Sequence, residues 1–382
     1  MDHRTAHRRA PRVTVVCPTY NRSEAITRTI DSVRAQTVEE WELLVVSDGS
    51  DDDTEAWVAR AAREDPRVRL VALSRTGHPS GPRNAGLAEA RGAYTAYLDH
   101  DDTWHPHHLR TVLELLEGGA DLAASGCEYR DATGGVAAGL PPLSCCWHPQ
   151  LQLMGPMFEP SRVAHRSGIV EAVGGWRTGA GLEDWDLWLR LADAGRTFAT
   201  ALEPTAVLLT DGGTRRHRMA RPHRMPLVHL DDARAAHALL GELRAGSHDE
   251  TFRASCREDM REWYAGMVRD GGLVRPVDWH GDLGDEIDRV VGGTGRLFEE
   301  LVLVPDRGRF ALARNLLCAR PEHARRATAL LPAVQPRQLR LLNGLAERAG
   351  RAGQAGQAER SGRAGRTEPT AGRVEGAVRQ GV

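Results

Sequence analysis

The fold is decided by one stretch, Ala93-Tyr-Thr-Ala-Tyr-Leu-Asp99-His-Asp101-Asp102-Thr-Trp104. A β-prone apolar run ends here in three carboxylates within four positions. Neighbouring carboxylates repel one another and are costly to desolvate, so such a cluster serves either a solvated turn or a divalent cation. Open α/β sheets bind ligands at the carboxyl ends of their strands. The stretch therefore predicts a ligand site at a strand end, with an acidic turn as the alternative.

The residues before this stretch alternate between two patterns. Short buried runs predict strands, and apolar residues spaced three or four apart predict helices between them. The expected strands cover 13–17, 43–46, 68–73 and 94–98, and the expected helices cover 24–35, 53–63 and 81–90. Strands that alternate with helices of this length form βαβ units around a mainly parallel sheet. We therefore expect a Rossmann-like α/β fold.

The residues after Trp104 continue this pattern and then depart from it. Helices are expected at 106–116, 163–173 and 182–195, and strands at 121–124, 197–201 and 206–210. From about residue 222 the pattern is helical and rich in arginine. The predicted organisation is a disordered basic arm over 1–11, an α/β domain over 12–220, a helical accessory region over 221–345 and a disordered tail over 346–382.

Composition limits the classes of function. The chain has 382 residues, of which 41% are hydrophobic and 27% charged, as in globular proteins. Its net charge of −2 gives no general attraction to nucleic acid or to an anionic membrane. All 50 basic residues are arginine, which excludes chemistry that needs a lysine. No apolar run is long enough to span a membrane, and the six cysteines have neither metal-ligand nor disulfide spacing, so we expect a cytoplasmic protein.

Three other readings of the motifs compete. Asp99-His-Asp101-Asp102-Thr103 also fits the D-x-D-x-T motif of haloacid-dehalogenase-like phosphatases, but three βα units precede it and the chain has no lysine. A sugar-1-phosphate nucleotidyltransferase would need a glycine-rich phosphate loop near the N-terminus, which the residues after Pro18 do not provide. A zinc site would draw on His100, His105, His107 and His108, yet three of these lie within or directly after a Trp-His-Pro turn that opens a helix.

Five motifs in order resemble family 2 glycosyltransferases of GT-A fold. They are Val13-Thr-Val-Val-Cys-Pro18-Thr-Tyr20-Asn21, Leu43-Leu-Val-Val-Ser-Asp48-Gly-Ser50, Arg83-Asn-Ala-Gly86, Tyr97-Leu-Asp99-His-Asp101-Asp102, and Gly174-Gly-Trp176 with Glu183-Asp184-Trp-Asp-Leu-Trp-Leu-Arg190. The resemblance covers about residues 12–218. It implies an enzyme that moves a sugar from a nucleotide-sugar donor, UDP-linked by our expectation, to a hydroxyl acceptor with inversion at the anomeric carbon.

The resemblance also assigns roles. It implies that Pro18, Tyr20, Asp48, Arg83 and Asp99 bind the nucleotide-sugar, with Asp48 accepting from the base and Asp99 contacting the ribose. A turn-forming role is the alternative for Asp48. Asp101 would ligate Mg²⁺ or Mn²⁺ through carboxylate oxygens, which hard cations prefer. His217 stands where relatives carry a metal- or phosphate-contacting histidine.

The acceptor-side motif supplies the candidate general base, Asp184. Apolar residues at i+3, i+4 and i+7 place its side chain beside the buried stripe of a helix. Partial burial raises the pKa of a carboxyl group and makes it a better proton acceptor. Glu183 and Asp186 are the fallback candidates. The acceptor itself, whether glycan, lipid-linked or small molecule, stays open, as does a peripheral membrane contact through the arginine-rich residues 309–340.

Overall fold

The structure is a computed structural model, and it describes residues 10–131, 135–137, 140–179, 181–210, 223–293 and 295–364. The chain forms two compact units whose segments interleave along the sequence. The first unit runs to residue 224 and takes up residues 253–294 and 316–336 as well. The second takes up 225–252, 295–315 and the residues from 337 on. The predicted domain boundary at residue 220 thus lies near the first change of unit, but the chain returns to the first unit twice.

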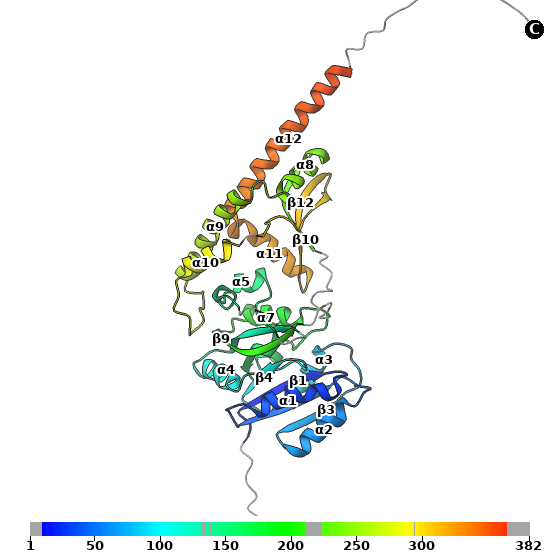
Figure 1. Ribbon diagram of the computed structural model, residues 1–382, viewed down its shortest axis with the longest axis vertical. Coiled ribbons are helices and arrows are strands. Elements are labelled where there is room, and N and C mark those ends of the chain that lie inside the picture. The colour runs from blue at the N-terminus through cyan, green and yellow to red at the C-terminus, as the bar shows by residue number, and fades with distance from the viewer. Residues whose placement is uncertain are drawn as a thin grey trace, which may run out of the picture. The chain divides into compact units, whose positions relative to one another are not determined.

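The first unit is built on one mixed sheet, whose described strands follow the order β3-β2-β1-β4-β8-β6-β9-β5 with β7 beside β6 (Figure 1). The first four strands in this order are parallel, so that Val13 of β1 lies opposite Trp41 of β2 and Tyr94 of β4. Strand β8 runs antiparallel between β4 and β6. The strands are β1 (Val13–Thr19), β2 (Trp41–Ser47), β3 (Val68–Ala72), β4 (Tyr94–Tyr97), β5 (Thr103–Trp104), β6 (Leu122–Asp131), β7 (Val136–Ala137), β8 (Val163–Arg166) and β9 (Phe198–Thr210).

Helices cover both faces of this sheet, because alternate strand residues point to opposite sides. Val15 of β1 packs in one core cluster with Ile30 of α1 and Leu109 of α4. Its neighbour Val16 packs in another cluster with Trp188 of α7. The helices are α1 (Ile26–Arg34), α2 (Thr54–Glu64), α3 (Ser80–Glu89), α4 (His108–Glu117), α5 (Pro149–Met154), α6 (Ile169–Ala172) and α7 (Glu183–Asp193), with 3-10 turns η1 (Ser23–Ala25), η2 (Pro142–Ser144) and η3 (Pro160–Arg162).

The α/β class and the parallel arrangement of the first four strands are confirmed, and two local predictions are wrong. The predicted helix over 163–173 is instead strand β8 followed by the short helix α6. The two strands predicted at 197–201 and 206–210 are one continuous strand, β9. Strand β8 lies buried between two neighbours, and this pairing has no local sequence signature.

The residues after 222 are mostly helical, as predicted, but they also form strands. β10 (His223–Leu230), β11 (Leu301–Asp306) and β12 (Arg309–Leu316) make a three-stranded sheet in the order β10-β12-β11, which the prediction of a helical region missed. Most of this sheet belongs to the second unit, together with α8 (Ala233–Arg244) and most of α12 (Pro336–Ala364). The remaining helices are α9 (Asp249–Arg269), α10 (Leu283–Val291) and α11 (Pro321–Val334).

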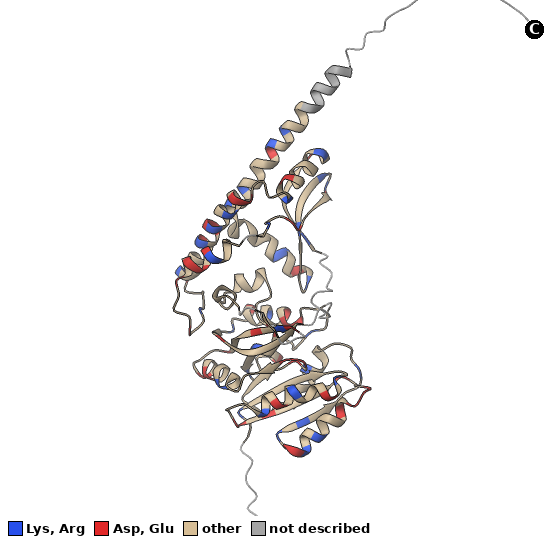
Figure 2. Cartoon of the chain, in the orientation of Figure 1, with Lys and Arg blue, Asp and Glu red and all other residues tan. Residues whose placement is uncertain are grey.

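Helix α12 runs through residue 346, where the sequence predicted a disordered tail to begin. The predicted tail beyond residue 364 and nine residues of the predicted arm lie outside the described residues. None of the described helices is both long and apolar enough to cross a bilayer. Acidic and arginine residues both occur along α2 and α9 (Figure 2).

Candidate active site

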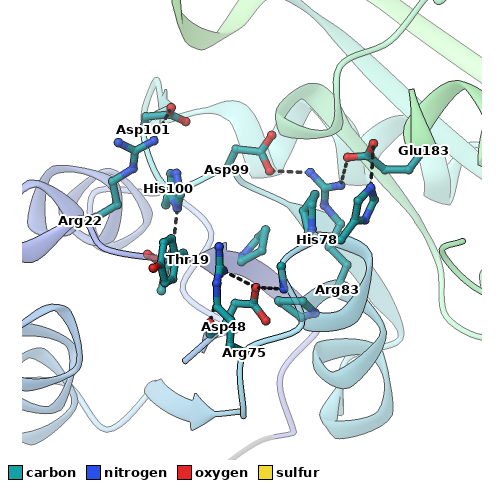
Figure 3. Close-up of a pocket in the computed structure, with 15 residues that line it drawn as sticks. Thr19, Arg22, Asp48, Arg75, His78, Arg83, Asp99, His100, Asp101 and Glu183 are labelled. Atoms are coloured by element: carbon teal, nitrogen blue, oxygen red, sulfur yellow. Dashed lines mark hydrogen bonds and ion pairs between the residues drawn. The ribbon is translucent and has the colours of Figure 1, made fainter. Parts of the chain in front are cut away.

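A cleft of about 420 Å³ opens at the carboxyl ends of β1, β2 and β4, where the acidic stretch predicts a ligand site. Its walls come from these strand ends, from the loop before α3 and from the start of α7 (Figure 3). The lining residues are Pro18, Thr19, Tyr20, Arg22, Asp48, Arg75, Gly77, His78, Pro79, Pro82, Arg83, Asp99, His100, Asp101 and Glu183. The cleft therefore gathers the predicted nucleotide-sugar residues and Asp101. Asp184 is the residue after the lining Glu183.

Asp48, at the end of β2, holds the loop of residues 75–77, which lies on the side of the cleft opposite the acidic stretch. Its carboxylate is 4% exposed and accepts hydrogen bonds from the backbone N–H groups of Thr76 (2.7 Å) and Gly77 (2.9 Å). It also accepts from the Thr76 hydroxyl (2.6 Å) and pairs with Arg75 (2.5 Å). A carboxylate has about four acceptor sites. The structure thus gives Asp48 a loop-fastening role, close to the turn-forming alternative, while the predicted contact with a nucleobase stays a prediction.

Tyr20 lines the cleft with its ring stacked against Arg75. The Arg75 guanidinium carbon lies 3.3 Å from the centroid of the Tyr20 ring, which is stacking distance. The Tyr20 backbone N–H donates to Nδ1 of His100 (3.3 Å). Burial, and then the positive charge of Arg22, lower the pKa of His100 to about 4. His100 is therefore neutral near pH 7, as an acceptor at Nδ1 must be.

Arg83 lies between two carboxylates that belong to different motifs. Its guanidinium is 2.7 Å from Asp99 and 3.2 Å from Glu183, and it stands 4.5 Å over the ring of Trp176. Burial alone lowers the pKa of the guanidinium, but the charges of Asp99 and Glu183 outweigh burial and raise it. The residue is 2% exposed, so Arg83 ties β4 to α7 as well as facing the cleft.

The position of Arg83 depends on a close approach of α3 to the sheet. A Cβ atom on Gly86 would lie 2.5 Å from a methyl carbon of Val16. Real Cβ contacts are not this short, so only glycine lets this turn of α3 pack against β1 at the observed distance. The Asn84 side chain adds two hydrogen bonds to the backbone of Trp176, at 2.8 Å each. The Arg-Asn-Ala-Gly motif is thereby explained as packing and positioning.

The three carboxylates of the acidic stretch have separate environments. Asp99 pairs with Arg83, and Asp101 pairs with Arg22 at 3.3 Å. Asp102 turns into the protein, where it accepts from the Ser161 hydroxyl (2.5 Å) and from the backbone N–H of Leu209 (3.1 Å). Burial, followed by the charges of Asp99 and Asp101, raises the pKa of Asp102 well above its usual value. Asp102 therefore connects β4 to β9 and is not a cleft residue.

Within the described residues, the donor set fits a cation that arrives with a diphosphate better than a resident metal centre. Across the described residues, no three His, Cys, Asp or Glu side chains converge in a metal-binding arrangement. Asp99 and Asp101 nonetheless present carboxylate oxygens to the same cleft. Magnesium-type sites commonly combine one or two carboxylates with substrate phosphates. His217, the other predicted metal ligand, lies outside the described residues.

The predicted base lies at the start of α7, after a residue with unusual backbone geometry. Leu182 has φ +57°, a left-handed conformation that non-glycine residues seldom adopt. Burial raises the pKa of Asp184 to about 7, and the neighbouring Glu183 adds to the rise, whereas the Trp185 N–H and Arg83 oppose it. The expected pKa shift of Asp184 is thus present, and its catalytic role stays a prediction.

The two fallback candidates are both held by cations. Glu183 is 6% exposed, pairs with Arg83 and has Nε2 of His78 at 3.8 Å. Asp186 is 2% exposed and pairs with two arginines, Arg190 and Arg320.

Sequence reasoning missed the loop that closes the cleft opposite the acidic stretch. Arg75, Thr76 and His78 belong to a polar run between β3 and α3 that has no motif spacing. Their only sequence signal is their place, because loops after parallel strands face the same sheet edge. The role of Ser161, which contacts both Asp102 and the Asp99 N–H, had no signal at all.

Comparison with known proteins gives a consistent result. Residues 14–152 match the family model described as glycosyl transferase family 2. The succinoglycan biosynthesis protein ExoO of Rhizobium meliloti is 41% identical over 160 residues, which is 42% of this chain and 45% of ExoO. The Escherichia coli protein WfgD, named UDP-Glc:alpha-D-GlcNAc-diphosphoundecaprenol beta-1,3-glucosyltransferase, is 35% identical over 104 residues, or 27% of this chain and 40% of WfgD.

The chain therefore spans less than half the length of these two curated relatives. Among solved structures, a Pyrobaculum calidifontis mannosyltransferase, PcManGT in complex with GDP-Man and Mn²⁺, covers 53% of this chain and 57% of its own, with 23% identity and a TM-score of 0.42.

Proposed function

We propose that this chain, which through residues 14–152 belongs to glycosyl transferase family 2, transfers a sugar from a nucleoside diphosphate sugar to a hydroxyl acceptor with inversion. One observation carries the proposal. A carboxyl group with a pKa near 7, Asp184, directly follows a residue that lines a cleft holding Asp48, Asp99 and Asp101 at the ends of parallel strands. This pairs a proton acceptor matched to neutral pH with a site suited to a nucleotide.

The donor binds, in this proposal, along the strand ends. The ring of Tyr20, backed by Arg75, offers a flat surface on which a nucleobase stacks. Pro18 and the loop held by Asp48 border the base, and Asp99 accepts from the ribose. We propose a UDP-linked donor, and the name of WfgD, which specifies UDP-Glc, supports this choice.

A divalent cation, Mg²⁺ or Mn²⁺, completes the proposed site. The cleft is lined by three arginines and four carboxylates, which leaves one net negative charge before the donor enters. A sugar diphosphate adds further negative charge, so an accompanying cation offsets repulsion that the arginines do not cancel. Asp101 would hold the cation, with His217 as a second candidate ligand. When bound, the cation stabilises the charge on the departing nucleoside diphosphate.

The chemical step follows from the roles of this chain's residues. Asp184 takes the proton of the acceptor hydroxyl, whose oxygen then bonds to the anomeric carbon as the bond to the diphosphate oxygen breaks. Attack from the side opposite the leaving group inverts the anomeric configuration. Glu183 is poorly suited as the base because the buried Arg83 pairs with its carboxylate. Arg83 keeps the start of α7 beside the donor end of the cleft.

The acceptor class stays broad in the proposal: a glycan, a lipid-linked sugar or a small molecule. The six cysteines, all within the described residues, are free thiols, which fits the proposed cytoplasmic location. The nucleotidyltransferase and phosphatase readings gain no support, because the matched family is neither and Asp99 follows β4, the fourth strand along the chain.

A donor screen tests the proposal. The purified chain is incubated with UDP-, dTDP- and GDP-sugars in the presence of Mn²⁺, and nucleotide release is measured together with binding of the free nucleotides. We expect slow hydrolysis of a UDP-sugar and saturable UDP binding. Tyr20→Ala should weaken UDP binding, whereas Tyr94→Ala, which removes a tyrosine outside the cleft, should not. Absence of both hydrolysis and nucleotide binding would refute the proposed function.

A further inference from the structure

The segment that leads into α11 contacts the helix carrying the proposed base. Asp186 lies in the first turn of α7 and is 2% exposed. Its carboxylate accepts from Nε of Arg190 on the same helix (3.0 Å) and from Nε of Arg320, which is 134 positions away in sequence (2.7 Å). A buried carboxylate needs such partners to offset its lost hydration. Arg320 therefore ties a distant part of the chain to the start of α7.

The first turn of α7 is held from two sides, because Glu183 pairs with the buried Arg83 at 3.2 Å on the cleft side and Asp186 pairs with Arg320 on the other. Within the described residues, no side chain caps the helix, and the residue before it, Leu182, is in the left-handed conformation. The Trp185 N–H of this turn is accepted by the Asp184 carboxylate itself (2.7 Å), so the turn has no cap from the preceding residue. Asp184 lies in this turn, so its position depends on what holds Glu183, Trp185 and Asp186.

The contacts of Trp185 also connect the first turn of α7 to α5 and to the segment around α11. Its indole N–H donates to the carbonyl of Gln152 in α5 (2.5 Å), and its ring is 2% exposed. It packs in a cluster with Leu182 and Leu189 that also contains Ala327 of α11 and the partly buried Leu317, Cys318, Ala319 and Leu330. The outer face of α7 is thus covered by residues from 316–334, which belong to the same compact unit as the cleft.

The contacts of Asp186 also extend toward the donor side. Arg190 uses its other N–H groups on the carbonyls of Val173 (2.7 Å) and Gly175 (2.8 Å). The next residue, Trp176, lies under the guanidinium of Arg83. One network of contacts therefore runs from Arg320 through Asp186 and Arg190 to the loop that carries Trp176, whose ring lies beneath Arg83.

We propose that Arg320 is a positioning residue for the transfer reaction, which fixes the first turn of α7 and with it the carboxylate of Asp184. The proposal rests on the function proposed above, because it assigns Arg320 its effect through the general base. It also makes the segment around Arg320 part of the catalytic unit, although it lies far beyond the family match at 14–152. A displaced base is costly, since misplacement of about 1 Å can reduce a rate roughly 10²-fold.

Helix α11 supplies a matched control in Arg326. Its guanidinium pairs with Asp193 at the other end of α7, at 2.8 and 2.9 Å, so it is as close to its partner as Arg320 is. Both side chains of this pair are exposed, at 44% and 51%, whereas Asp186 is buried. Arg326→Ala thus removes a bridge between the same two helices without touching the first turn.

The experiment compares R320A, R320K and R326A in the full chain, using hydrolysis of the UDP-sugar that the wild-type chain accepts. We expect R320A to lower kcat about tenfold or more with KM for the donor unchanged, since the nucleotide contacts lie elsewhere. Loss of the Arg320 contact should expose Asp184 to water and lower its pKa. The acid limb of the pH profile of kcat should therefore lie at lower pH in R320A than in the wild type. R320K should recover part of kcat, and R326A should match the wild type in all three measurements.

Equal effects of R320A and R326A, or a change in KM alone, would overturn the inference while leaving the proposed function intact. An inactive wild-type chain that binds no UDP would instead remove the proposed function. Should R320A fail to fold, R320Q is compared in its place, since its shorter side chain keeps an uncharged N–H donor near the position of Nε, the atom that contacts Asp186. If R320Q also fails to fold while R326A folds, Arg320 is needed for the whole unit and the positioning role is wrong.

Discussion

Replacing Asp184 by asparagine is the sharpest test of the proposed chemistry. The substitution keeps the shape of the side chain and the first turn of α7 but removes the proton acceptor. General-base catalysis contributes about 10²–10⁴ in rate, which corresponds to about 2.7–5.4 kcal/mol of transition-state stabilisation. The donor contacts lie on the strand ends and on the loop held by Asp48, so the affinity for UDP should be unchanged.

The pH dependence follows from the raised pKa of Asp184. A base with a pKa of about 7 is about one-tenth ionised at pH 6 and about nine-tenths ionised at pH 8. The wild-type kcat should therefore rise nearly tenfold between pH 6 and pH 8. Asp184→Asn should lose this limb and retain a low rate that is flat over the same range.

The same pKa shift predicts the effect on stability. A carboxyl group with a higher pKa in the folded than in the unfolded state binds its proton more tightly when folded. Its contribution to the free energy of unfolding therefore declines as pH rises from about 4 to about 7, and above that range the buried charge is a constant cost. Asp184→Asn removes this cost, so its melting temperature should exceed that of the wild type at pH 8 and approach it at pH 4.

The assay measures nucleotide release and melting temperature for Asp184→Asn beside a control, Asp193→Asn. Asp193 ends the same helix, and its side chain is 51% exposed, so the control makes the same chemical change away from the cleft. The reasoning is refuted if Asp184→Asn turns over near the wild-type rate. Loss of activity in Glu183→Gln or Asp186→Asn with an active Asp184→Asn would assign the base to a neighbouring residue.

Three further predictions concern other parts of the chain. Asp101→Asn should raise the Mn²⁺ concentration needed for half-maximal turnover at least tenfold without changing the melting temperature, and full wild-type activity in excess EDTA would contradict a cation-dependent step. Asp48→Asn should weaken UDP binding, measured by calorimetry, because one oxygen that holds the 75–77 loop becomes a donor; unchanged UDP affinity would separate the loop from the nucleotide site. Deletion of the residues after Ala349 should shift the melting temperature by less than about 2 °C, since residues 350–355 are largely exposed; a larger drop would show that the end of α12 packs.

The sheet and the core of the cleft could be predicted because their signals are local. The buried runs of β1, β2 and β4 each end in the residues that line the cleft, such as Tyr20, Asp48 and Asp99. A parallel sheet brings such ends to one edge, so strand order did not need to be known. The raised pKa expected for Asp184 likewise followed from helical spacing alone.

The contacts that no motif predicted are those between residues distant in sequence. Arg320 meets Asp186, and Ser161 meets Asp102, through single hydrogen bonds whose partners have ordinary local sequence contexts. The strand β8 was mistaken for a helix because four residues between two buried neighbours show no clear period. Asp48 differs from these examples. Its position at a strand end was predicted, but the motif around Asp48 gave no sign that its carboxylate would hold the loop of residues 75–77.

The interleaving of the two units affects how the chain matures on the ribosome. Asp186 is synthesised 134 residues before Arg320, and translation at 5–20 residues per second places roughly 7–27 seconds between them. During that interval the face of α7 around Trp185 has no cover from residues 316–334, so a nascent chain that already contains every matched family residue still exposes part of its core. Chaperone binding to stalled nascent chains should accordingly persist until the ribosome has passed α11, long after the last strand of the large sheet has emerged.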